Sequence, residues 1–249
     1  MNILDEIVAN TKAKVSIAKE KVSLDDLVST IHSNKIVKSK FKASLKDKDQ
    51  AIIAEIKKAS PSAGVISENF DPVTKAKEYE AFGASALSIL TEEDYFLGST
   101  QYLKDVKKIS KLPILRKDFI VDIYQIYESK LIGSDCILLI ASILSDEELN
   151  DFTKLADTLE LDYIIEVHNE DELKRVQDFS EAIIGVNNRD LKSFTVDIEN
   201  SIRLKQLFNR DNLFVAESGI KGQSDINKLL RNGINIFLIG ESLMKGDFV

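Results

Sequence analysis

The sequence contains few of the residues that build disulfides or membrane spans. Its only cysteine is Cys136, so no disulfide can form within the chain, which fits a reducing compartment. Cys136 opens an apolar run over residues 136–140 and is expected to be buried and inert. No apolar run reaches the roughly 18 residues of a membrane-spanning helix, and the first residues are acidic where a signal peptide would be basic. We therefore expect a cytoplasmic protein with no membrane partner.

Positive charge is scarce relative to negative charge. There are 33 Lys and Arg against 41 Asp and Glu, which gives a formal net charge of -8. Long-range attraction to nucleic acid is therefore not expected, and an anionic ligand must be held by local positive groups. Only three prolines and ten glycines occur in 249 residues, and no low-complexity linker is present. We expect a single domain over residues 1–249, and a monomer.

Short apolar and β-branched runs recur from residue 51 onward, separated by amphipathic stretches. They begin near Ala51, Ser85, Pro113, Cys136, Tyr163, Ala182, Leu213 and Ile236. Their mean separation of about 26 residues fits a strand, a helix and two short loops, and continuous apolar runs suit parallel strands covered on both faces. The pattern predicts an α/β fold, a (β/α)8 TIM barrel with its strands within residues 51–241. An open doubly wound sheet is the alternative arrangement of the same units, and the eightfold count favours closure.

The two ends of the chain differ from the repeat. Residues 1–45 are predicted to form an N-terminal helical extension, with Ile3, Leu4 and Ile7 on one helix face and a second helix start at Ser23. After the eighth strand only residues 241–249 remain. The eighth helix is therefore expected to be short or truncated, which would leave apolar surface on the eighth and first strands partly uncovered.

Polar side chains end each of the eight runs. The residues are Glu55 and Lys57, Thr91 to Glu93, Arg116 to Asp118, Ser142, Glu166, Asn187 and Arg189, Glu217 and Ser218, and Glu241 and Ser242. Any one of them taken singly is more often a solvated charge. Together they converge on one mouth, because all strand ends of a parallel barrel meet at the same face. Glu55 and Lys57 lie two apart, so both point inward if Ile56 faces the helices.

Two further groups of residues suggest what this mouth binds. Gly219 and Gly240 follow the seventh and eighth strands, where backbone N–H groups of this fold often bind phosphate. Apolar residues at or just past strand ends could form a wall for a planar ring or could anchor loops: Phe96, Phe119, Leu139, Phe194 and Ile239. His168 could face the mouth, but no second histidine or cysteine lies near it in the sequence, so no metal site is expected.

Taken together, these motifs resemble the indole-3-glycerol phosphate synthase family. The matching segments are residues 53–62, with the sequence IAEIKKASPS, 88–92 (SILTE), 114–119 (ILRKDF), 165–167 (IEV), 185–190 (GVNNRD), 216–220 (AESGI) and 237–240 (FLIG). They extend from the first strand to the eighth. The resemblance implies a (β/α)8 barrel that closes the pyrrole ring of a carboxyphenylamino-deoxyribulose 5-phosphate, with loss of CO2 and water. It implies no cofactor and no metal.

The resemblance also implies roles for single residues. Lys117 would be the general acid that protonates the substrate carbonyl, Lys57 would pair with anionic groups of the substrate, and Glu166 would take part in proton transfer during dehydration. The other implied positions are Glu55, Asn187, Glu217 and Ser218 in the polar ring, Ser60 and Arg189 as substrate contacts, Gly219, Gly240 and Glu241 at the phosphate, and Phe96, Phe119, Leu139, Phe194 and Ile239 in the apolar pocket. The loop over residues 58–69 is expected to close over substrate, the alternative being a plain surface connection.

Two rival functions remain at this point. Another phosphate-sugar barrel, of the phosphoribosylanthranilate isomerase type, would need an acid–base Cys/Asp pair at strand ends, but Cys136 opens its strand. A catalytically silent barrel is the second rival. The presence of Lys57, Lys117 and Glu166 argues against it.

Overall fold

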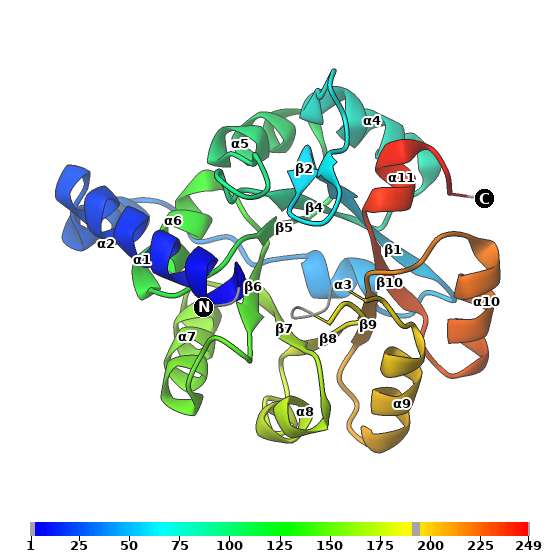
Figure 1. Ribbon diagram of the computed structural model, residues 1–249. Helices are drawn as coiled ribbons and strands as arrows, with labels where there is room; N and C mark the ends of the chain where they lie inside the picture. Colours follow the sequence, from blue (N-terminus) through cyan, green and yellow to red (C-terminus); the bar gives the residue numbers. More distant parts are fainter. Residues whose placement is uncertain (1–2, 191–194, 249) are drawn as a thin grey trace.

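Eight parallel strands form a closed barrel in the computed structural model, which describes residues 3–190 and 195–248 (Figure 1). The strands are β1 (Ala51–Ile56), β4 (Ala86–Leu90), β5 (Ile114–Lys117), β6 (Cys136–Ile140), β7 (Asp162–Val167), β8 (Ile183–Asn187), β9 (Phe214–Glu217) and β10 (Ile236–Ile239). β10 pairs with β1, with Ala54 opposite Ile239, and this pairing closes the barrel. Each strand begins within one residue of its predicted start, and the closed barrel is confirmed.

Helices follow the strands and cover the outside of the barrel. They are α4 (Pro72–Phe82), α5 (Thr100–Ile109), α6 (Ile123–Ile132), α7 (Asp146–Thr158), α8 (Glu170–Val176), α9 (Glu199–Leu207), α10 (Gln223–Arg231) and α11 (Glu241–Lys245). Capping residues fix two of the helix starts: Asp71 caps α4 with Pro72 at its first position, and Ser145 forms a capping box with Glu148. α4 and α6 end at Gly83 and Gly133, whose φ angles of 94° and 91° suit glycine.

Alternation along the strands divides the apolar residues into two cores. Ile53, Leu115 and Ile164 face the barrel interior, whereas Ile52, Ile56 and Ile165 face the helices. The interior core also includes two fully buried side chains of α3 (Phe41–Leu45). Because α3 packs beside the first residues of the strands, it closes that end of the barrel, and the opposite end is left for the site.

The N-terminal extension consists of helices α1 (Ile3–Lys21), α2 (Leu24–Ser33) and α3. α1 and α2 pack against α6, and Figure 1 shows the start of α1 lying over the carboxyl ends of the strands. Tyr124 of α6 is buried between Val15 and Leu27, and Lys19 forms an ion pair of 2.7 Å with Asp122. The helical extension predicted for residues 1–45 is therefore present.

The helix after the eighth strand, α11, has five residues, so the predicted short helix is confirmed. The expectation that strands β10 and β1 would be partly uncovered was wrong, because every residue of both strands is buried. Leu243 and Met244 of α11 and the partly buried Phe248 pack on the outer core. Phe248 also makes an edge contact with Phe82 of α4, with ring centroids 6.0 Å apart. The short segment thus covers the surface that a longer helix would cover.

The loop that follows β1 contains a small antiparallel hairpin of β2 (Ala59–Ser60) and β3 (Gly64–Val65). Its ends are held together by a hydrogen bond of 2.8 Å from the Ile66 backbone N–H to the Lys58 carbonyl oxygen. Ser60 is buried, whereas Val65 is 54% exposed.

Among the described residues, no helix combines the length and apolar character that crossing a membrane requires.

Candidate active site

Four strands place a charged side chain inside the barrel mouth by the same local rule. In each strand an apolar residue of the interior core is followed two positions later by a charged residue: Ile53 by Glu55, Leu115 by Lys117, Ile164 by Glu166, and Val215 by Glu217. Residues two apart on a strand point to the same side, so the charged layer lies directly above the apolar interior. The expectation that Ile56 faces the helices, and therefore that Glu55 points inward, is confirmed.

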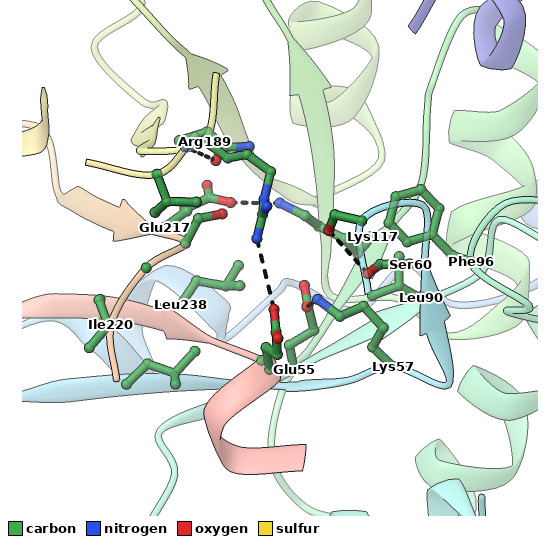
Figure 2. Close-up of a pocket in the computed structure, with 18 of the residues that line it drawn as sticks. Glu55, Lys57, Ser60, Leu90, Phe96, Lys117, Arg189, Glu217, Ile220 and Leu238 are labelled. Atoms are coloured by element: carbon green, nitrogen blue, oxygen red, sulfur yellow. Dashed lines mark hydrogen bonds and ion pairs between the residues drawn. The ribbon is translucent and has the colours of Figure 1, made fainter. Parts of the chain in front are cut away.

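The mouth encloses a cavity of about 770 Å³, and its charged core is drawn in Figure 2. Fifteen of the residues predicted for the site line this cavity: Glu55, Lys57, Ser60, Phe96, Lys117, Phe119, Glu166, Asn187, Arg189, Glu217, Ser218, Gly219, Ile239, Gly240 and Glu241. The strand ends and their loops thus bring together residues that are far apart in the sequence.

Lys117 lies at the centre of the charged layer. Its ammonium group is 2.6 Å from Glu217 Oε2 and 3.0 Å from Glu166 Oε2, and Figure 2 shows Lys117 and Glu217 pointing toward each other. Burial alone would lower the pKa of Lys117, but the charges of Glu166, Glu217 and Glu55 outweigh it and raise the pKa well above its ordinary value. The surrounding carboxylates therefore favour the cationic form of Lys117, whose side chain is only 15% exposed.

A second ion pair lies beside the first. Lys57 Nζ is 2.5 Å from Glu55 Oε1, and the Lys57 and Glu55 side chains are only 15% and 6% exposed. Glu55 in turn needs the glycine at position 240, because a Cβ atom there would collide with its carboxylate. Gly240 therefore makes room for a carboxylate as well as ending β10.

The carboxyl group of Glu217 has a pKa that is raised into the neutral range. Burial and the nearby charges of Glu166 and Glu55 raise its pKa to about 7, although Lys117 acts in the opposite direction. Its Oε2 accepts from Lys117, whereas Oε1 finds no hydrogen-bond donor among residues 3–190 and 195–248. This oxygen occupies the space that the missing side chain of Gly185 leaves. Glu217 can therefore exchange a proton near neutral pH.

Glu166 has the opposite character. Burial would raise its pKa, but the charges and hydrogen bonds of Lys117 and His168 lower the pKa far below its ordinary value. Its Oε1 accepts a hydrogen bond of 3.2 Å from the Asn187 side chain and lies 3.3 Å from His168 Nε2. The two buried carboxylates on one lysine thus have pKa values shifted in opposite directions, an arrangement that suits groups with different tasks in proton transfer.

The loops after β8, β9 and β10 form the other side of the cavity. Ser218 and Gly219 both have left-handed backbone, with φ of 67° and 81°, and Ser218 is held there by a hydrogen bond of 3.1 Å from the Asn188 side chain to its carbonyl oxygen. Arg189 Nη2 lies 3.8 Å from Glu241 Oε2, across the opening. Figure 2 shows the Arg189 side chain extending from the β8 side over this opening. The region can offer cations and backbone N–H groups to an anion.

One predicted pocket residue, Leu139, does not have the expected place. Leu139 is not among the described residues that line the cavity, because it points outward into the core beneath the helices. Its neighbours Leu138 and Ile140 line the cavity instead. Phe194 lies outside the described residues.

Several strand-end charges from the sequence have a structural task. Arg116 points away from the mouth, where its guanidinium lies 3.1 Å from Asp118 and 2.8 Å from Glu128 of α6. Glu92 accepts hydrogen bonds of 3.0, 2.7 and 3.0 Å from the backbone N–H groups of residues 94, 95 and 96, and so shapes the loop that carries Phe96. Arg116 and Glu92, which are not among the described residues that line the cavity, support the site from outside.

Sequence reasoning missed one wall of the cavity. Ile3, Leu4 and Ile7 of α1 line it, beside Leu138 and Ile140. The helix is fixed there by Lys14, whose ammonium lies 2.8 Å from Asp94, and by a further contact between Asn10 and Asp94. The apolar face of residues 3 to 8 was visible in the sequence, but nothing in the sequence showed where it packs.

Within the described parts of the chain, no cluster of three or more His, Cys, Asp or Glu side chains could hold a metal ion.

Comparison with known proteins decides between the possible barrels. The model of the family described as indole-3-glycerol phosphate synthase matches residues 4–249. The chain belongs to the indole-3-glycerol phosphate synthase family. It is 50% identical over 246 residues to the indole-3-glycerol phosphate synthase of Ruminiclostridium cellulolyticum, covering 98% of this chain and 94% of that protein. It is 49% identical over 243 residues to the enzyme of the same name from Clostridium acetobutylicum, covering 98% and 92%.

Family membership confirms the resemblance found in the sequence and makes the chain a carboxy-lyase of tryptophan biosynthesis. Among solved structures, the tryptophan synthase A-subunit of Pyrococcus furiosus is similar, with a TM-score of 0.59, 14% identity, and coverage of 79% of this chain and 89% of that one. At this identity the similarity supports the barrel fold alone.

Proposed function

We propose that Lys117 is the general acid of a ring closure that converts 1-(2-carboxyphenylamino)-1-deoxyribulose 5-phosphate to indole-3-glycerol phosphate, CO2 and water. The observation that carries this proposal is the buried ammonium group of Lys117 between Glu166 and Glu217. A cation in a site with little water stabilises negative charge that grows on a carbonyl oxygen. The ring carbon that bears the carboxylate attacks this carbonyl, the oxygen takes the Lys117 proton, and loss of CO2 restores the aromatic ring.

The two carboxylates set the pKa of the Lys117 ammonium group. When Glu217 is protonated, Lys117 keeps only one close carboxylate partner, so its pKa falls toward a value at which it donates readily. Because the pKa of Glu217 is about 7, both of its forms are populated near neutral pH. Glu217 also lies 2.6 Å from Lys117, close enough to return a proton to it after each turnover.

Glu166 acts in the dehydration that follows. While Lys117 is charged, Glu166 is a very weak base, because the cation beside it lowers its pKa. Once Lys117 has given up its proton, that stabilisation is gone and the basicity of Glu166 rises. Glu166 then accepts the proton that leaves the new ring, while the hydroxyl group departs as water with a proton from Lys57. Because Lys117 and Glu166 are in contact, the proton transfer from Lys117 precedes the proton transfer to Glu166.

The rest of the cavity binds the substrate. Lys57, paired with Glu55, attracts the substrate's anionic groups and takes part in proton handling, and Ser60 and Asn187 contribute hydrogen bonds. The phosphate is bound by Ser218, by the backbone N–H groups of Gly219, Gly240 and Glu241, and by Arg189. The planar ring packs against an apolar wall of Phe96, Phe119, Leu138, Ile140 and Ile239. Phosphate and ring thus lie at opposite sides of the buried charges.

The test replaces Lys117 with methionine, which keeps most of the volume but cannot donate a proton. Lys117→Met is expected to lower kcat by at least about a hundredfold, the usual contribution of a general acid. The matched control is Lys111→Met, because Lys111 is exposed in the loop before β5. Product is measured by its indole fluorescence, and the chain itself contains no tryptophan. Near-normal turnover of the folded Lys117→Met protein would remove Lys117 from the mechanism.

A further inference from the structure

Three ionisable side chains form a row from the barrel mouth to helix α8. Glu166 Oε1 lies 3.3 Å from His168 Nε2, and His168 Nδ1 lies 3.1 Å from Glu172 Oε2. The backbone N–H of His168 also donates to Glu172 Oε2 at 2.8 Å, and the side chain of Asn169 donates to the other carboxylate oxygen at 2.7 Å. Glu172 therefore clamps the histidine by its backbone and by its ring.

His168 lies behind the site, without a place in its wall. It follows β7 directly, its side chain is 12% exposed, and it is not among the described residues that line the cavity. From α9, Asn200 donates to its backbone carbonyl oxygen at 3.0 Å. These contacts leave the imidazole beside Glu166 and outside the wall of the cavity.

The charges of the mouth explain why a cation is useful at this point. In the described part of the chain, the innermost layer contains three carboxylates, those of Glu55, Glu166 and Glu217, but only two ammonium groups, those of Lys57 and Lys117. Buried carboxylates of like charge push each other toward the neutral form. A protonated imidazole beside Glu166 supplies the third positive charge without occupying space that the substrate needs.

We propose that His168 is a positioning residue for the ring closure: as an imidazolium clamped by Glu172, it fixes the side chain of Glu166 and keeps that carboxylate ionised. The inference rests on the role proposed above for Glu166. A uniform binding effect is not expected, because His168 does not face the cavity. Its loss should instead lower kcat with little change in KM.

The protonation state of His168 follows from its neighbours. Burial would lower its pKa, but Glu166 and Glu172 outweigh this effect and raise the pKa to about 10. The groups facing it are these two carboxylates and, beyond Glu166, Lys117 and Glu217. Both ring nitrogens of an imidazolium carry a proton: Nδ1 is hydrogen-bonded to Glu172, whereas Nε2 lies within ion-pair distance of Glu166 without forming a hydrogen bond to it among the described residues. Activity that depends on His168 should therefore be lost as the pH rises through this pKa.

The first arm of the test is a titration that does not depend on turnover. The chain has only two histidines, His32 and His168, and His32 is exposed on α2. In the His32→Gln variant a single imidazole remains, and its ring signals in an NMR titration report His168 alone. We expect a ring that is protonated near pH 7 and loses its proton only near about pH 10. A ring that is neutral near pH 7 would overturn the proposal.

The second arm is kinetic. We expect His168→Gln to lower kcat about tenfold with KM changed less than about twofold, as for other groups that orient a site residue. Glu172→Gln should retain activity at low pH but lose it at a lower pH than the wild type, because removing the Glu172 charge lowers the pKa of His168. His32→Gln is the matched control and should leave both constants unchanged. Wild-type kcat in folded His168→Gln protein would contradict the inference.

A third variant separates this inference from the role of Glu166 itself. Adding His168→Gln to Glu166→Gln should cause no further loss of kcat, because the histidine acts through that carboxylate. If Glu166→Gln alone has full activity, the proposed role of Glu166 fails. Comparing the histidine titration with and without Glu166→Gln in the His32→Gln background then still shows whether Glu166 raises the His168 pKa. If Glu166→Gln lowers kcat to a measurable residual rate and adding His168→Gln lowers that rate further, His168 acts by another route and the inference is wrong.

Discussion

Glu217 allows a sharp test of the electrostatics of the barrel mouth. The perturbation is Glu217→Gln, which keeps the shape of the side chain and removes its ability to ionise. In the native protein, burial and the charges of Glu166 and Glu55 raise the pKa of Glu217 from 4.5 to about 7. Between these two values the unfolded chain has lost the proton that the folded protein still carries. The free energy of unfolding contributed by this group therefore falls as the pH rises.

The size of the effect follows from the shift. One pKa unit corresponds to about 1.4 kcal/mol, so the shift of Glu217 lowers the free energy of unfolding by about 3 kcal/mol between about pH 4.5 and pH 7. In the Glu217→Gln variant the side chain at position 217 does not ionise, so this fall in the free energy of unfolding is absent. Relative to the wild type, Glu217→Gln should gain about 3 kcal/mol of stability as the pH is raised from about 5 to about 8.

The assay is urea unfolding followed by circular dichroism at both pH values, for the wild type and the variant. Taking the difference between the two proteins cancels the titration of groups that both share. Lys117 and Glu166 contribute little to this difference, because their pKa values are shifted away from the measured range. A stability difference that stays constant from about pH 5 to about pH 8 would refute the burial and charge pattern assigned to Glu217.

Two further predictions concern the space and the loop around the site. Gly185→Ala places a Cβ atom 2.8 Å from Ile164 Cγ2 and against the Glu217 carboxylate, so it should destabilise the protein by about 1–3 kcal/mol and lower kcat; an unchanged melting temperature and kcat would contradict this packing. The hairpin loop over residues 58–69 is predicted to close over bound substrate, because buried Ser60 lines the cavity while Val65 is exposed. Limited proteolysis should therefore cut this loop more slowly with a substrate analogue, and equal cutting rates would count against closure.

The barrel could be predicted from the sequence because two repeating patterns, the spacing of the apolar runs and the two-residue alternation along a strand, indicate the same fold. Apolar runs of strand length recur with the spacing of a βα unit, and residues two apart on a strand share a face. The second rule placed Glu55 and Lys57 on one side of β1, and the structure has both at the cavity. Patterns of this kind can be read from the sequence, because each depends only on residues that are close together along the chain.

The parts that could not be predicted depend on tertiary packing. In β6 every residue from Cys136 to Ile140 is apolar and buried, so the sequence does not distinguish the inward Leu138 from the outward Leu139. Phe248 packs on the outer core and contacts Phe82 of α4, which is far away in the sequence. The docking of α1 at the mouth likewise depends on Lys14 meeting Asp94. No local pattern indicates such pairings.

Turnover of the proposed substrate tests the central claim most directly. The wild-type protein is incubated with 1-(2-carboxyphenylamino)-1-deoxyribulose 5-phosphate while indole fluorescence and released CO2 are followed together. The proposed ring closure releases one CO2 for each indole ring formed, and the assay contains no added metal or cofactor. We expect both signals to rise at equal molar rates in the wild type and to be at least about a hundredfold slower in Lys117→Met. Folded wild-type protein that forms neither indole nor CO2 would contradict the account.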